Sequence, residues 1–458
     1  MKNNPSNTIM SRRALLKGLA FGSGALALAA CAPAARPAAQ SPAQATPVES
    51  APQPNEPVQM LYWGFSGGLG NTEDELVKMF NDKQMGVTVQ REVQGSYEET
   101  AQKLTAQLAA KTGLPDMVLL SDVWWFMFYR SQSLLPLNEL IAAEKVDTAD
   151  FVDSLWTEGV RKGVQHWIPF ARSTPLFYYN ADLFAAAGLP ERGPKNWAEF
   201  MEWAPKLVQK EGDTVKVAAF SHPGAASYIA WLFQCVIWQH GGAYSDADFN
   251  IKLSEPDGIR AAQFYQDTVN EMGWAIASQD AQKDFTTGLA AATMLSTGGL
   301  TGILKDATFK VGTAFLPEEK QFGCCTGGSG LAILSTTPPE KAAAAMTYIN
   351  YATGNEGGAF WSQNTGYMPV RKSTAASESY AKFFEQVPQA KTAVEQLPKT
   401  KPQDAARVFI PGGDQIIGKG LERIVIGKED VATVWAEVTD QLNKAAEPVK
   451  KDIAAMGG

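Results

Sequence analysis

Residues 58–81 read VQMLYWGFSGGLGNTEDELVKMFN and contain the unit from which the fold is built. The first six residues are a short apolar run, which predicts a strand that ends at Gly64. From Thr72 to Asn81 the apolar residues recur at helical spacing, which predicts a helix. Thr72 and Glu75 have the spacing of a capping box, so we expect the helix to begin at Thr72.

The same alternation of strand and helix recurs along the chain. Strands are predicted at 87–89, 117–120, 175–179 and 331–334, and helices at 97–111 and 431–442. The last helix places its apolar residues on one face, which predicts packing in the core. Such alternation predicts an α/β fold with open, largely parallel sheets flanked by helices. About 400 residues follow position 57, too many for one core, which predicts two lobes.

The N-terminal region has the order of an export signal. Basic residues precede an apolar run from Gly18 to Ala30, and these thirteen residues are too few to cross a membrane. Residues 11–17 (SRRALLK) resemble a twin-arginine motif, and residues 28–31 (LAAC) resemble a bacterial lipobox, in which Cys31 becomes the acylated N-terminus. The alternative is an ordinary secretory signal with an incidental arginine pair and cysteine. Both interpretations place the protein outside the cytoplasm.

Residues 32–57 are mostly Ala, Pro, Gln, Ser, Thr and Glu, a composition with too little apolar surface to form a core. We therefore expect a disordered tether between the lipidated Cys31 and a folded body. The expected location is the outer face of the cell membrane, on its extracellular or periplasmic side.

Charge and cysteine content exclude several functions. The formal charge is −8, and residues 1–30 carry four basic and no acidic side chains, so the processed chain is more acidic still. This balance argues against nucleic acid as a partner. Cys235, Cys324 and Cys325 lack the spacing of a metal site. A disulfide between Cys235 and either of the other two, or three buried free thiols, are both open at this point.

A series of short motifs, in order and over the whole chain after residue 57, resembles the extracellular solute-binding proteins of sugar-type ABC importers. The motifs are PDMV (115–118), LLPL (134–137), IPF (168–170), YYNADLF (178–184), AGLP (187–190) and PKNWAEF (194–200). Further stretches, PFARSTP (169–175) and TGYMP (365–369), together with the region around Arg407, are similar to the glycerol-3-phosphate and glycerophosphodiester-binding members.

The resemblance implies a two-lobed periplasmic-binding-protein fold of type II, with the ligand in a cleft between the lobes. It assigns residues 58–172 and 328–370 to the first lobe and residues 173–327 and 371–458 to the second. It also implies a monomer that delivers a sugar or polyol phosphate to ABC permease subunits in the membrane, without a cofactor.

The ligand-contacting positions of the family fall on a defined set of residues in this chain. The predicted ligand residues are Tyr97, Asp122, Ser173, Ser296, Gly328, Tyr367 and Arg407, to which Trp63 is added. A guanidinium such as that of Arg407 can hold a phosphate through two parallel hydrogen bonds. Asp122 stands where a longer Glu is expected, and residues 222–228 replace a Gly- and Trp-rich segment. These departures keep a neutral mono- or oligosaccharide open as the alternative ligand.

One motif suggests an enzyme instead. Residues 64–68 (GFSGG) fit the nucleophile elbow of serine hydrolases, with Ser66 as the nucleophile. Such an elbow needs an activating histidine, and it usually follows several strands rather than the first. Acidic residues such as Asp116 and Glu92 could also suggest a glycosidase pair, but nothing in the sequence fixes their separation. We therefore expect no catalytic residue and no metal, and keep a secreted hydrolase only as a remote alternative.

Overall fold

The computed structural model describes residues 56–212, 214–224 and 226–455. The predicted signal, Cys31 and nearly all of the predicted tether lie outside these residues. None of the helices in the described ranges has the length and apolarity that crossing a membrane requires.

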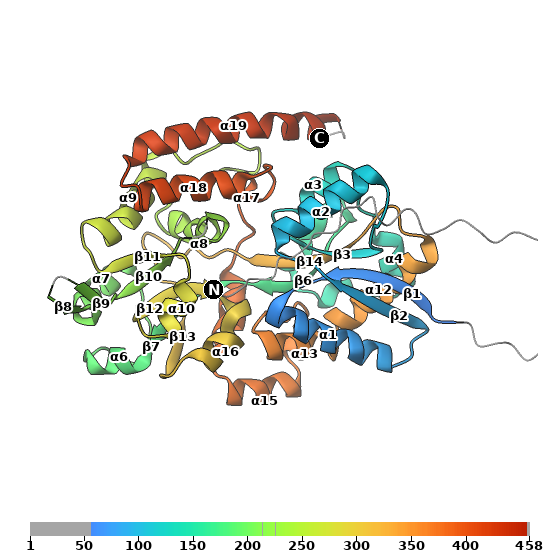
Figure 1. Cartoon of the computed structure of the whole chain (residues 1–458), viewed down its shortest axis with the longest axis horizontal. Helices are drawn as coiled ribbons and strands as arrows, with labels where there is room; N and C mark the ends of the chain where they lie inside the picture. The colour runs from blue at the N-terminus through green and yellow to red at the C-terminus, as the bar shows by residue number, and fades with distance from the viewer. Residues whose placement is uncertain (1–55, 213, 225, 456–458) are drawn as a thin grey trace, which may run out of the picture. The chain divides into compact units, whose positions relative to one another are not determined.

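Two five-stranded sheets organise the described part of the chain, and they lie on the right and on the left of Figure 1. The first sheet has the strand order β2 (Val87–Val93), β1 (Val58–Gly64), β3 (Met117–Ser121), β14 (Gly327–Ile333) and β6 (Ile168–Ser173). The second has the order β11 (Ala275–Ser278), β10 (Phe220–Pro223), β12 (Ala292–Ser296), β7 (Pro175–Asn180) and β13 (Val311–Ala314). Two hairpins, β4 (Val160–Arg161) with β5 (Val164–Gln165) and β8 (Gln209–Glu211) with β9 (Thr214–Val217), lie outside the sheets.

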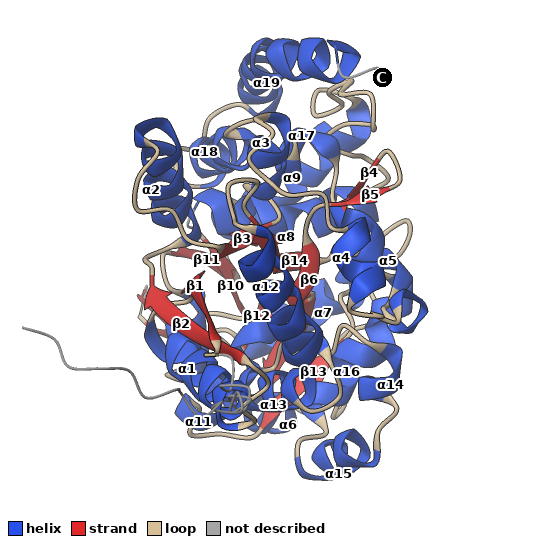
Figure 2. Cartoon of the chain, turned by 90° about the vertical axis from the view of Figure 1, so that its right-hand side faces the viewer, coloured by secondary structure: helices blue, strands red, loops and turns tan. Residues whose placement is uncertain are grey.

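Helices surround both sheets, as Figure 2 shows. The first sheet is accompanied by α1 (Gly67–Asp82), α2 (Tyr97–Ala110), α3 (Trp125–Arg130), α4 (Asn138–Ala143), α5 (Asp153–Trp156), α12 (Pro339–Thr353) and α13 (Gly357–Thr365). The second is accompanied by α6 (Ala181–Ala186), α7 (Trp197–Leu207), α8 (Ala226–Gln239), α9 (Pro256–Asn270), α10 (Ala281–Thr286), α11 (Leu300–Asp306) and α16 (Gln389–Gln396). The short helices α14 (Lys372–Ala375) and α15 (Glu378–Gln386) connect α13 to α16. The predicted two-lobed α/β fold is confirmed.

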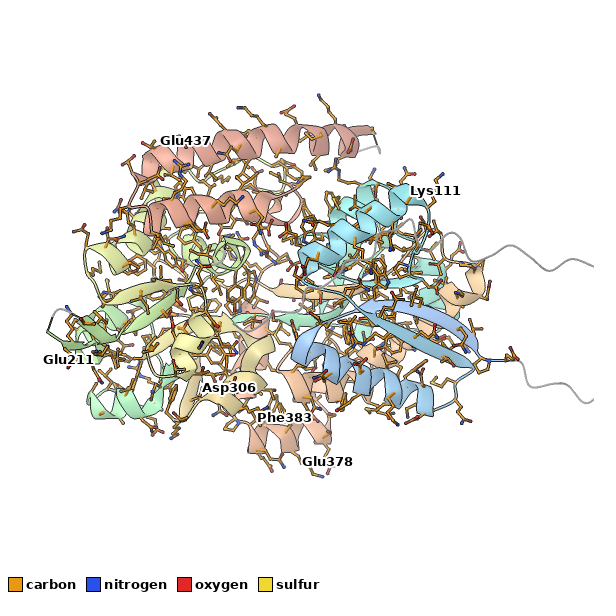
Figure 3. All side chains as sticks on the ribbon, in the orientation of Figure 1. Lys111, Glu211, Asp306, Glu378, Phe383 and Glu437 are labelled. Atoms are coloured by element: carbon orange, nitrogen blue, oxygen red, sulfur yellow. The ribbon has the colours of Figure 1, made fainter. Side chains whose placement is uncertain are left out.

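The C-terminal helices return to the second lobe. They are α17 (Ala405–Val408), α18 (Gly413–Val425) and α19 (Val431–Ala455), and α18 packs on α8 and α9. The predicted apolar face of the last helix is confirmed, because Val431, Val434, Trp435, Val438 and Leu442 are all buried. The charged residues Lys111, Glu211, Glu378 and Glu437 lie on the outside of the molecule in Figure 3.

The sheets are less parallel than the sequence predicts. In the first sheet β1 runs parallel to β2 and β3, but β14 is antiparallel to both of its neighbours. In the second, β7 is likewise antiparallel to β12 and β13. The reason is that β7 and β14 come from the other lobe. Each enters its sheet beside the carboxyl-terminal ends of the parallel strands, and it therefore runs antiparallel to them.

The predicted start of the first helix is wrong. Helix α1 begins at Gly67, with Ser66 as its N-cap and without a capping side chain, five residues before Thr72. The buried carboxylate of Glu73 accepts a 2.7 Å hydrogen bond from the backbone N–H of Phe65 and another from the Tyr62 hydroxyl. These bonds tie the glycine-rich turn to the helix, which therefore extends back through the glycines.

Candidate ligand-binding cleft

A cavity of about 350 Å³ lies between residues of the two lobes. Its lining residues are Tyr97, Ser121, Asp122, Val123, Ser173, Tyr228, Trp231, Ser296, Gly328, Tyr367 and Arg407. Several of them stand at strand ends: Ser121 closes β3, Ser173 closes β6 and Ser296 closes β12. Ligands of open α/β sheets bind at the carboxyl ends of strands, and this cavity has that position in both sheets.

Gly328 allows the backbone of β14 to pass close to the cavity. Its φ of +107° lies in the region that side chains disfavour, and a Cβ there would stand 2.1 Å from the carbonyl oxygen of Ala171. Its own carbonyl accepts a 3.0 Å hydrogen bond from the backbone N–H of Asp122. The glycine therefore sets the spacing between the strand that crosses from the second lobe and the end of β3.

The charged groups of the cleft form a connected network. The carboxylate of Asp122 lies 3.7 Å from the Arg172 guanidinium and 4.0 Å from that of Arg407. Arg172 also pairs with Glu158, whose other oxygen accepts a 2.6 Å hydrogen bond from Thr326. Burial raises the pKa of Glu158. Burial alone would lower the pKa of Arg172, but Glu158 and Asp122 raise it above the ordinary value, so this guanidinium stays charged.

Hydroxyl and aromatic groups complete the cavity wall. The hydroxyl of Ser121 is buried and has no hydrogen-bond partner within the described part of the chain. Tyr97 donates a 3.2 Å hydrogen bond to Ser329, and burial raises its pKa to about 12, so it remains a neutral donor. The rings of Tyr228 and Trp231 stack at 5.7 Å. An unpaired buried hydroxyl costs about 1–3 kcal/mol, which a polar ligand would offset.

Arg407 lies in α17, and Asp404, the residue that precedes this helix, holds its N-terminus in place. The Asp404 carboxylate accepts hydrogen bonds from the Gln234 amide and the Tyr244 backbone N–H, each at 2.7 Å, and from the Trp238 indole at 3.1 Å. Burial raises the pKa of Asp404 to about 6. Because two of these donors belong to α8, the position of Arg407 depends on that helix.

A second, smaller cavity of about 200 Å³ shares Asp122 with the first. It is lined by Asp122, Trp125, Thr157, Glu158, Arg161, Pro402, Gln403, Val408 and Phe409. The two cavities together therefore run along the contact between the lobes, on either side of Asp122.

The structure brings together seven of the eight predicted ligand residues. Trp63 is the exception: it is buried in the core, donates a 3.0 Å hydrogen bond to Glu92 and packs under Lys103. Sequence reasoning missed Ser121, Val123, Tyr228 and Trp231. The signal for Ser121 and Val123 was their adjacency to Asp122 at a strand end. Tyr228 and Trp231 lie in or just after the segment that departs from the family pattern, and they supply aromatic faces there.

Three thiols lie behind the wall of the cleft. Cys235, Cys324 and Cys325 are buried and free, and the sulfurs of Cys235 and Cys325 are 3.5 Å apart. Cys324 contacts the hydroxyl of Thr174, the residue between β6 and β7 where the chain crosses from one sheet to the other. Of the two alternatives left open by the sequence, the structure has the free thiols.

The hydrolase hypothesis lacks its geometry. No hydrogen bond within the described ranges joins the Ser66 hydroxyl to a histidine. His222 instead contacts Thr268, and His240 contacts the backbone carbonyl of Val236. Ser66 is an exposed residue at the start of α1.

Comparisons with known proteins agree with this arrangement. The family model described as bacterial extracellular solute-binding protein matches residues 75–391. The sn-glycerol-3-phosphate-binding periplasmic protein UgpB of Escherichia coli strain K12 is 24% identical over 396 residues, which cover 80% of this chain and 88% of that protein. The crystal structure of UgpB from Mycobacterium tuberculosis in complex with glycerophosphocholine matches with a TM-score of 0.80 at 39% identity, over 86% of this chain and 98% of that one.

The GacH receptor of Streptomyces glaucescens GLA.O, solved unliganded and with acarbose, is 18% identical with a TM-score of 0.73 over 85% of this chain and 98% of that one, and so shares the fold. These homologues bind substrates and are not enzymes, so the hydrolase alternative is wrong. The chain belongs to the bacterial extracellular solute-binding protein family.

Proposed function

We propose that the protein binds a glycerol-3-phosphate-like ligand or a glycerophosphodiester between its lobes and delivers it to the permease of an ABC importer. The observation that carries the ligand class is the charge of the cleft. Among the described residues, Arg161 and Arg407 line the two cavities, and the buried Arg172 pairs with Asp122 and Glu158, the two carboxylates in the cavity walls. These three guanidinium groups outnumber the two carboxylates. The cleft is therefore positive within an acidic chain, which favours an anionic ligand.

In this proposal the predicted ligand residues contact different parts of the ligand. Arg407 holds the phosphate with charge-assisted hydrogen bonds. Asp122, Ser121, Ser173 and Ser296 bond the hydroxyl groups of the glycerol. Tyr97, Tyr367 and the added Trp231 pack on its C–H faces. The relative from Mycobacterium tuberculosis was crystallised with a glycerophosphodiester, which supports this ligand class.

The lobes that we propose comprise residues 58–172 with 328–370 and residues 173–327 with 371–458. They close on the ligand by rotation about the crossings, because contacts from both sides favour the closed state. In the same proposal the chain is exported through its N-terminal signal and anchored as a lipoprotein through Cys31. It acts as a monomer and carries out no covalent chemistry on the ligand.

Calorimetric titration of the purified protein tests the ligand class. Glycerol-3-phosphate and a glycerophosphodiester should bind, and maltose and maltotriose should not. A ligand at 100 times its Kd should also raise the free energy of unfolding by about 2.7 kcal/mol. Binding of the neutral sugars, with no response to either phosphate, would replace the proposal by the neutral-sugar alternative.

Anchoring is tested separately in the native host. Cys31→Ala should move the protein from the membrane fraction to the soluble extracytoplasmic fraction. Retention of this variant in the membrane fraction would contradict a lipid anchor at Cys31.

A further inference from the structure

Arg161 is an unusual cation in the smaller cavity. Its guanidinium lies over three aromatic rings, with centroid distances of 4.9 Å to Trp125, 5.2 Å to Phe126 and 4.3 Å to Phe409. Its Nη1 donates a 2.7 Å hydrogen bond to the carbonyl of Val160. Its Nη2 is buried without a hydrogen-bond partner among the described residues.

No carboxylate in the described part of the chain lies within 4.0 Å of this guanidinium. Burial lowers the pKa of Arg161 to about 10, so the group is still charged at neutral pH. Arg161 is half-buried, but its Nη2 is fully covered, and a buried N–H group without an acceptor is costly. An acceptor supplied by a ligand would remove that cost.

The carboxylates of the same cavity are already engaged. Asp122 accepts a 2.6 Å hydrogen bond from Gln403 and faces Arg172. Glu158 pairs with Arg172 and accepts from Thr326. The one charge of this cavity that lacks an ionic partner within the described residues is therefore the positive charge of Arg161.

The side chains of the smaller cavity would accept some ligand groups and disfavour others. A hydroxyl or an anionic oxygen can accept a hydrogen bond from Nη2 of Arg161. A quaternary ammonium group would instead meet a like charge. The faces of Trp125 and Phe409, which could otherwise hold such a group by cation–π attraction, are already covered by the guanidinium.

We propose that the smaller cavity receives the second alcohol of a glycerophosphodiester, and that Arg161 selects head groups rich in hydroxyls or negative charge over quaternary ammonium head groups. This inference rests on the proposed function, with the glycerophosphate in the larger cavity. The two cavities adjoin at Asp122, so the phosphodiester linkage passes beside that residue and the side chain of Gln403.

Titration calorimetry with three ligands tests the selection. The ligands are glycerol-3-phosphate, glycerophosphoglycerol and glycerophosphocholine. The wild-type protein should bind glycerophosphoglycerol about tenfold or more tightly than glycerophosphocholine, as one charge-assisted hydrogen bond predicts. Arg161→Met keeps the packing on the rings but removes the charge and the donor, so the ratio of the two affinities should fall toward one.

A matched control is available in Arg192, whose guanidinium also lies over a tryptophan, Trp203, but pairs with Glu199 outside the two cavities. Arg192→Met should keep the wild-type ratio. Arg161→Lys, which retains the charge, should still disfavour the choline head group, and thermal unfolding of each variant checks that it is folded.

The outcomes distinguish failure of the selection by Arg161 from failure of the proposed function. If glycerophosphocholine binds the wild-type protein as tightly as glycerophosphoglycerol, or if Arg161→Met keeps the wild-type ratio, the selection by Arg161 is wrong while glycerophosphate binding stands. If none of the three ligands binds the wild-type protein, the proposed function itself fails.

Discussion

The side-chain amide of Gln403 donates a 2.6 Å hydrogen bond to the carboxylate of Asp122, across 281 positions of the sequence. Its carbonyl oxygen accepts a hydrogen bond from the guanidinium of Arg407. The Gln403 amide therefore connects Asp122, which follows β3 of the first sheet, with Arg407 of α17. The contact lies at the boundary of the two cavities.

Gln403→Ala should weaken ligand binding without abolishing it. The variant removes a hydrogen bond across the cleft and one partner of Arg407, so we expect the Kd of glycerol-3-phosphate to rise about 3- to 15-fold. Titration calorimetry measures the change, with Gln102→Ala on the exposed face of α2 as the control. An unchanged Kd would show that this hydrogen bond does not contribute to closure.

Arg407→Ala should distinguish charged from neutral ligands. Loss of a charge-assisted contact to phosphate costs about 1.5–3 kcal/mol, so the affinity for glycerol-3-phosphate should fall roughly 10- to 150-fold. Arg423→Ala is the control, because this arginine pairs with Glu429 and Glu437 on the surface. Equal affinity of Arg407→Ala and wild type would remove Arg407 as the phosphate-binding group.

Gly328→Ala should destabilise the protein. The new Cβ would meet the carbonyl of Ala171 at 2.1 Å in a backbone conformation with φ of +107°. Strain of this kind costs about 1–3 kcal/mol, and the shift of β14 should also impair ligand binding. Gly68→Ala is the matched control, since a Cβ there meets nothing within 4 Å. Denaturant unfolding compares the two, and equal stability of both variants would contradict the close approach.

Glu73 should make stability depend on pH. Burial raises its pKa to about 7, although the Tyr62 hydroxyl, Arg91 and the Phe65 N–H favour the charged form. The folded state thus binds a proton more tightly than the unfolded state, whose pKa is near 4.5. The resulting stabilisation is complete below pH about 4.5 and is lost as the pH rises through about 7.

Thermal unfolding between pH 4.5 and 8 measures this effect. The Tm of the wild type should fall over that interval, and Glu73→Gln, which cannot ionise, should reduce the slope. Tyr348 and Asp74 also face this cluster, through Tyr62 and Arg91 respectively, and both stay in place in the variant. Glu75→Gln, on the exposed side of the same helix, should keep the wild-type slope. A Glu73→Gln slope equal to that of the wild type would refute the assignment.

The sequence by itself determined several of the elements and the family. Helix α2 is predicted to within a residue because the pattern that predicts it is local, and the structure adds a capping box in which Ser96 and Glu99 bond each other's backbone N–H groups. The buried face of α19 follows from periodicity in the same way. Seven ligand candidates came from motifs matched to a family, and these residues converge on one cavity.

Only the tertiary structure decided which further side chains share the cleft. Strand order, the antiparallel course of β7 and β14 and the packing of α8 bring Trp231, Gln403 and Arg161 beside Asp122, and none of these relationships has a local pattern. Trp63 is the opposite case. It stands near the end of a strand, like the cleft residues, but the tertiary structure encloses it in the core. The physical reason is that helical periodicity and capping act between residues three or four positions apart. The cleft depends also on contacts between residues far apart in the sequence, such as Asp122 and Gln403 across 281 positions, and the crossings between the sheets set those contacts.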